Sequence, residues 1–124
     1  MKPFQVILVK SKDPYVRGFQ YGSQAKLKIQ SGIKNYKEYF ERTSNKSWNE
    51  IKQYAMDYVP IINKNMPEVM EEAKGIADGA EVEIGEVMVL NCRYEITKFP
   101  KSPDECTTAV ILPEATGNNT YLIK

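Results

Sequence analysis

The sequence predicts an α+β protein, with a predominantly helical N-terminal segment, a short N-terminal strand and a C-terminal β-hairpin. Three observations lead to this prediction. Capping residues precede apolar residues at helical spacing several times between residues 13 and 97. Residues 4–10 and 106–112 are rich in apolar and β-branched residues, which is typical of strands. Residues 115–119, which read Ala-Thr-Gly-Asn-Asn, have the composition of a hairpin turn.

Length and composition limit the possible classes of protein. A chain of 124 residues allows one domain, which buries roughly two-thirds of its unfolded surface. A net charge of +1 argues against a nucleic-acid partner, and no apolar run approaches the roughly 18 residues of a membrane span. With no recognisable secretion signal, we expect a cytoplasmic protein. The two cysteines provide neither a disulfide framework nor metal-ligand spacing, so no cofactor is predicted.

The first predicted helix begins at Asp13, a helix-capping residue followed by proline. It continues to Glu41, with a possible kink at Gly32. Gly18 and Gly22 lie four residues apart and so share one face of this helix. Each glycine costs about 1 kcal/mol relative to alanine inside a helix, which indicates a packing reason for their presence. We therefore expect another backbone to approach this face closely.

Three further helices are predicted before residue 98. Ser47 and Glu50 form a capping box for a helix that reaches Ile62, which Pro60 should kink or tighten. The next helix opens over residues 65–68, with Asn65 as its cap, and ends at Gly79. The last begins at Glu83 or Ile84. The apolar residues expected to face inward from the middle helix are Val69, Met70, Ala73, Ile76 and Ala77. Tyrosines and methionines at helical spacing could line a ligand groove, although core packing is the favoured interpretation.

Cys106 lies where the character of the chain changes abruptly. The segment before it, residues 98–105, is polar and contains two prolines, whereas residues 106–112 read as a strand. By position alone, a packing role is the simpler interpretation. The placement also suits a cysteine that becomes an N-terminus after cleavage. The chain contains no histidine, so the α-amino group of that cysteine, with an ordinary pKa of about 7.7–8.0, would have to serve as the base.

Four motifs in order give the chain a family resemblance. They are Arg17-Gly18-Phe19-Gln20-Tyr21-Gly22, Gly75-Ile76-Ala77-Asp78-Gly79-Ala80, Leu90-Asn91-Cys92-Arg93-Tyr94-Glu95 and Glu105-Cys106-Thr107-Thr108. Together they resemble the N-terminal portion of the acyl-coenzyme A:6-aminopenicillanate acyltransferase (isopenicillin-N acyltransferase) family of self-processing N-terminal-nucleophile hydrolases. The resemblance implies a fragment of an αββα sandwich. Residues 1–105 would form a leader resembling the α-subunit, and residues 106–124 the first hairpin of the β-subunit.

The resemblance also implies roles for individual residues. Cys106 would be the nucleophile exposed by cleavage after Glu105, and Thr108 would assist that cleavage. Arg17, Arg93 and Glu95 are expected to be structural. In the family a glycine usually precedes the cysteine, and an Asn-x-Asp segment follows the strand that here ends at Lys124. We therefore expect the isolated 124 residues to be an inactive fragment of an enzyme that takes a small-molecule amide or acyl-coenzyme A. The exposed surface of such a fragment could self-associate. Alternatives are a non-catalytic helical interaction module and a degenerate homologue.

Overall fold

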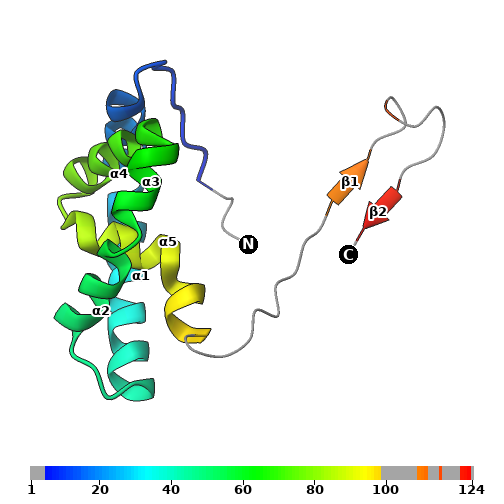
Figure 1. Ribbon diagram of the computed structural model, residues 1–124. Helices are drawn as coiled ribbons and strands as arrows, with labels where there is room; N and C mark the ends of the chain where they lie inside the picture. Colours follow the sequence, from blue (N-terminus) through cyan, green and yellow to red (C-terminus); the bar gives the residue numbers. More distant parts are fainter. Residues whose placement is uncertain (1–4, 99–108, 112–114, 116–120, 124) are drawn as a thin grey trace.

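The computed structural model describes residues 5–98, 109–111, 115 and 121–123 (Figure 1). These residues form α1 (Pro14–Thr43), α2 (Trp48–Met56), α3 (Val59–Asn65), α4 (Pro67–Ala80), α5 (Ile84–Lys98), β1 (Ala109–Ile111) and β2 (Tyr121–Ile123). The helices pack into one bundle, in which the long α1 lies along α4 and α5 packs mainly against α2.

Two helices begin at the predicted caps. The side chain of Asp13 accepts a hydrogen bond of 2.8 Å from the backbone N–H of Val16, and Pro14 takes the first helical position. At the start of α2, the backbone N–H of Ser47 donates to the Glu50 carboxylate at 2.7 Å, and the Glu50 N–H donates back to the Ser47 hydroxyl at 3.3 Å. The caps predicted at Asp13 and Ser47 are confirmed, because they depend only on residues within one turn.

The helix predicted from residue 48 to Ile62 is divided in two. α2 ends at Met56 and α3 begins at Val59, so the break precedes Pro60. Proline lacks a backbone N–H, and in the first turn of a helix that group has no partner to lose. Pro60 therefore starts α3, whereas we had expected it to bend a longer helix. In contrast, α1 is continuous through Gly32.

The prediction that α4 ends at Gly79 is wrong. The helix continues to Ala80, and Glu81 closes it in the left-handed conformation, with φ of 55°. The cap predicted at Asn65 is also wrong, because Asn65 is the last residue of α3 and Met66 takes the cap position of α4 without a side-chain hydrogen bond. Val69 was expected to face inward but is 48% exposed, whereas Met70 is buried as predicted.

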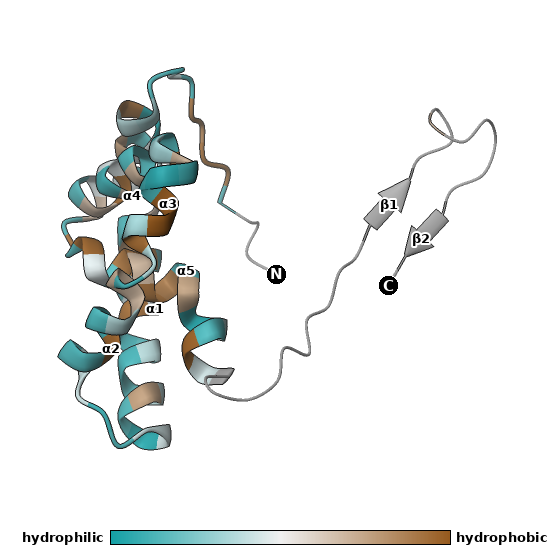
Figure 2. Cartoon of the chain, viewed as in Figure 1, coloured by the Kyte–Doolittle hydropathy of each residue, from teal (hydrophilic) through white to brown (hydrophobic). Residues whose placement is uncertain are grey.

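One apolar core joins α1, α2, α4 and α5. Its buried members are Ala25, Ile29, Ile33 and Phe40 from α1, Trp48, Ile51 and Ala55 from α2, Met70 and Ala80 from α4, and Met88, Val89 and Cys92 from α5. The helices show polar residues on their outward sides (Figure 2). Among the described residues, no helix combines the length and the apolar character needed to cross a membrane.

The closest helix packing is between α1 and α4. A Cβ atom added to Gly18 would lie 2.0 Å from the carbonyl oxygen of Glu72, and one added to Gly22 would lie 2.4 Å from that of Ile76. From the other side, a Cβ at Gly75 or Gly79 would come equally close to backbone of α1. The predicted close approach to Gly18 and Gly22 is therefore confirmed. Gly18 meets Glu72, and Gly22 meets Ile76 further along α4, so α1 and α4 run parallel.

The N-terminal strand predicted over residues 4–10 is wrong for its described part, residues 5–10. This segment is extended but pairs with no described strand. Instead, the side-chain amide of Gln24 accepts from the Leu8 N–H at 3.1 Å and donates to the Leu8 carbonyl at 2.8 Å. Gln20 accepts from the Lys10 N–H at 3.1 Å. The backbone groups thus bond to glutamines of α1 in the absence of a neighbouring strand.

The predicted fold class also needs correction. β1 and β2 pair antiparallel, with Ala109 opposite Ile123 and Ile111 opposite Tyr121, and they are the only sheet within the described residues. An αββα sandwich needs two sheets packed face to face, so that architecture is not seen. The described chain is a helical bundle with one two-stranded ribbon. The strand predicted over residues 106–112 and the hairpin predicted over 106–124 extend into residues outside the described part.

Candidate functional site

The residues predicted to carry chemistry, Glu105, Cys106 and Thr108, lie outside the described residues. The boundary predicted between residues 105 and 106 lies there too. Their roles therefore stay predictions. What the structure describes is the helical body that precedes them, including the motifs around Gly18, Gly75 and Arg93.

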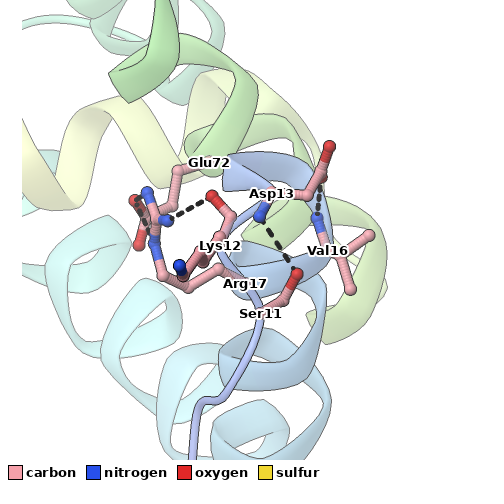
Figure 3. Close-up of polar contacts among 6 residues, drawn as sticks. All are labelled: Ser11, Lys12, Asp13, Val16, Arg17 and Glu72. Carbon is pink, nitrogen blue, oxygen red and sulfur yellow. Dashed lines mark hydrogen bonds and ion pairs between the residues drawn. The ribbon is translucent and has the colours of Figure 1, made fainter.

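Arg17 is an anchor between α1 and α4, as predicted. Its Nε and Nη2 atoms donate to one carboxylate oxygen of Glu72 at 3.0 and 2.7 Å, and Nη1 donates to the Lys12 carbonyl at 3.1 Å (Figure 3). The hydrogen bond to Glu72 raises the pKa of Arg17 above its ordinary value. All three guanidinium nitrogens thus bind groups of the protein, which leaves Arg17 a structural role.

The first two family-like motifs meet at this same helix contact. Besides the four glycines, the Tyr15 hydroxyl next to the first motif donates to Asp78 of the second at 2.7 Å. That hydrogen bond raises the pKa of Tyr15. The sequence showed the four-residue glycine spacing in both motifs, but did not show that each pair is the other's partner. These two motifs therefore form a scaffold that holds α1 against α4.

The third motif lies on α5. Arg93 donates to the Leu90 carbonyl oxygen, and its guanidinium carbon lies 5.7 Å from the centre of the Tyr36 ring. Arg93 and Glu95 were expected to have different partners because they are two residues apart, and Arg93 indeed contacts α1. Cys92 is buried, and that burial raises the pKa of its thiol. A thiol held protonated in the core is a poor nucleophile.

A cavity of about 560 Å³ opens where the C-terminal part of α1, α2 and the end of α5 meet. Its aromatic and aliphatic lining residues are Tyr39, Phe40, Ile51, Tyr54, Tyr58 and Ile96, and its charged ones are Lys46, Asp57 and Glu95. Core packing is the interpretation that the sequence favours for its helically spaced tyrosines, yet Tyr39, Tyr54 and Tyr58 line this cavity. The ammonium of Lys46 lies 5.0 Å from the centre of the Tyr54 ring.

A second, more open cavity of about 820 Å³ lies between α1, α2, α4 and the start of α5. Four of its charged groups form ion pairs with one another. Lys52 pairs with Glu83 at 2.7 Å and Lys74 with Glu71 at 2.6 Å. Within the described part of the chain, no group of three potential metal-ligating side chains occurs at either cavity or elsewhere.

Comparison with known proteins shows a distant family relationship. The chain is 32% identical, over 92 residues, to the 40 kDa form of acyl-coenzyme A:6-aminopenicillanic-acid-acyltransferase from Emericella nidulans. The match covers 73% of this chain but only 26% of the relative. The chain therefore spans about a quarter of the length of this curated relative. No protein-family model matches the chain.

Proposed function

We propose that the chain is the N-terminal part of a self-processing cysteine N-terminal-nucleophile hydrolase, acting on amide bonds as an amidohydrolase or acyltransferase. The observation that carries this proposal is the 32% identity over 92 residues to an enzyme named as an acyltransferase. The order of the four motifs supports membership of that family. A cytoplasmic location stays a prediction.

In the proposed cleavage, the Cys106 thiol attacks the carbonyl carbon of Glu105. The C–N bond between the two residues breaks, a thioester forms, and the nitrogen of Cys106 becomes an amine. Water then hydrolyses the thioester, which releases the carboxylate of Glu105 and returns the thiol. The hydroxyl of Thr108 supplies a hydrogen bond at this centre. The products are a chain ending at Glu105 and a chain beginning with Cys106.

In the processed enzyme, the free α-amino group of Cys106 accepts the thiol proton, and the thiolate attacks a small-molecule amide or an acyl-coenzyme A thioester. An amine or thiol leaves, and an acyl group remains on sulfur. Transfer of that group to water completes hydrolysis, and transfer to an amine completes acyl transfer. The absence of histidine supports an α-amino base, because no Cys-His pair can form within these residues. Cys92, the other cysteine, is buried.

The test uses protein expressed from the complete reading frame. We expect wild type to be cleaved, Cys106→Ala to stay whole and inactive, and Thr108→Ala to be cleaved more slowly. Glu105→Gly should speed cleavage by about tenfold, because glycine adopts strained backbone geometry that costs other residues of order 1–3 kcal/mol. Uncleaved protein that remains active when Cys106 is replaced would refute the proposal.

One observation favours a second candidate, a non-catalytic helical interaction module. Val6, Leu8 and Leu27 are 78%, 64% and 80% exposed, which leaves apolar side chains available to a partner or to a second copy of the chain. Light scattering after size exclusion tests self-association directly. A monomeric mass at every concentration would count against self-association. A degenerate homologue would instead keep the fold and show no cleavage in the mass measurement.

A further inference from the structure

We propose that the cavity between α1, α2 and the end of α5 binds a small organic cation, with an ammonium group on a compact apolar body. This binding does not depend on the proposed cysteine chemistry. The volume of about 560 Å³ lies within the range of roughly 300–1,000 Å³ that is typical of small-molecule sites.

The walls of the cavity suit a cation. Tyr39 and Phe40 come from α1, with ring centres 5.5 Å apart and an edge-to-face arrangement of 73°. Tyr54 comes from α2, and Tyr58 lies just before α3. The face of an aromatic ring carries partial negative charge and attracts an ammonium placed within about 6 Å.

The protein already places a cation at one of these rings. The Lys46 ammonium lies 5.0 Å from the Tyr54 ring centre, which is within that range. Lys46 is exposed and its stem is flexible, so this ammonium can leave the ring for water at little cost. It therefore marks a position that the ammonium of a ligand can take.

The charges of the cavity favour a cation over an anion. Asp57 and Glu95 both line it, and within the described part of the chain neither carboxylate has an ion pair. The second cavity differs, because there Lys52 and Lys74 are already paired with glutamates. When Lys46 leaves, the described lining holds two carboxylates and four aromatic rings and no other positively charged side chain.

The probe is choline, and its control is 3,3-dimethylbutan-1-ol, which has the same shape with carbon in place of the charged nitrogen. Amide chemical shifts of the labelled 124-residue chain, followed at millimolar ligand, report both affinity and location. We expect choline to cause saturable shift changes at the ends of α1, α2 and α5. The uncharged alcohol should bind at least about fivefold more weakly than choline. Benzoate tests the opposite preference for an anion at Lys46.

Three variants within the cavity and one control outside it extend the test. Lys46→Ala removes the internal competitor and should tighten choline binding by about two- to fivefold. The double variant Asp57→Asn, Glu95→Gln should weaken it. Tyr54→Leu should weaken it, whereas Tyr21→Leu, a change at a similarly exposed tyrosine outside the cavity, should not. These side chains are exposed, and circular dichroism confirms that each variant folds. Equal binding of the alcohol, tighter binding of benzoate, weaker binding by Lys46→Ala, or no saturable shift would each overturn the proposal.

Discussion

Replacing Gly18 by alanine tests the packing of α1 against α4. The added Cβ would lie 2.0 Å from the carbonyl oxygen of Glu72 and 2.9 Å from its carbonyl carbon. An ordinary contact needs about 3.4 Å, so the helices would have to separate locally by about 1.4 Å. The clashing atoms belong to backbone, which cannot turn aside as a side chain can.

The size of the effect follows from two opposing contributions. Overpacking a well-packed contact costs about 1–3 kcal/mol, and a backbone clash places Gly18→Ala at the upper end. Alanine gains about 1 kcal/mol over glycine in helix propensity. The net loss is about 2 kcal/mol, a large part of the roughly 5–15 kcal/mol of a typical domain. For a chain of this length we expect the melting temperature to fall by about 8 °C.

Gly32→Ala is the matched control in the same helix. Its Cβ would meet only the Leu90 side chain, at 3.9 Å, so the propensity gain of about 1 kcal/mol should appear as stabilisation. Urea denaturation measures both free energies of unfolding. Gly75→Ala should resemble Gly18→Ala, because its Cβ would lie 2.0 Å from the Tyr15 carbonyl oxygen. If Gly18→Ala proved as stable as Gly32→Ala, the close approach of α1 and α4 would be refuted.

Three further predictions concern individual side chains. Hydrogen bonds from Ser47 lower the pKa of Glu50, so the ionised carboxylate stabilises the fold above its ordinary pKa and this contribution is lost as the pH falls through the lowered value. At pH 7 wild type should therefore have a higher free energy of unfolding in urea than Glu50→Gln. Equal free energies at pH 7 would contradict this. A double-mutant cycle on Arg17 and Glu72, whose side chains are 31% and 35% exposed, should give a small favourable coupling that shrinks in molar salt. A coupling that salt leaves unchanged would indicate a buried pair. In a Cys106→Ala background, the buried Cys92 should react slowly with a thiol reagent until urea unfolds the chain. Rapid labelling of Cys92 in the folded protein would contradict its place in the core.

The sequence predicted features whose causes are local. Asp13 with Pro14 and Ser47 with Glu50 begin helices as expected, because each cap involves a few neighbouring residues. The predictions from sequence were wrong where a residue distant in the chain decides the local structure. Gly79 looked like a helix terminator, yet it serves the contact with α1, and the helix closes at Glu81.

The N-terminal segment shows the same limitation. Its apolar composition suits a strand, but a strand also requires a neighbour, and here Gln24 of α1 bonds to the backbone of Leu8. The tyrosine-lined cavity was likewise hidden, because helical spacing alone does not distinguish a core face from the wall of a pocket. Cys106 was found through its position and a family resemblance, and its role awaits experiment.

The most direct test of the proposed function is the intact mass of protein made from the complete reading frame. Self-processing predicts two fragments, one ending at Glu105 and one beginning with an unblocked Cys106, whose masses add up to the precursor plus one water. Cys106→Ala, purified in parallel, should give the precursor mass alone. A single uncleaved wild-type mass, or a cut at another bond that persists in Cys106→Ala, would contradict the proposed role of Cys106.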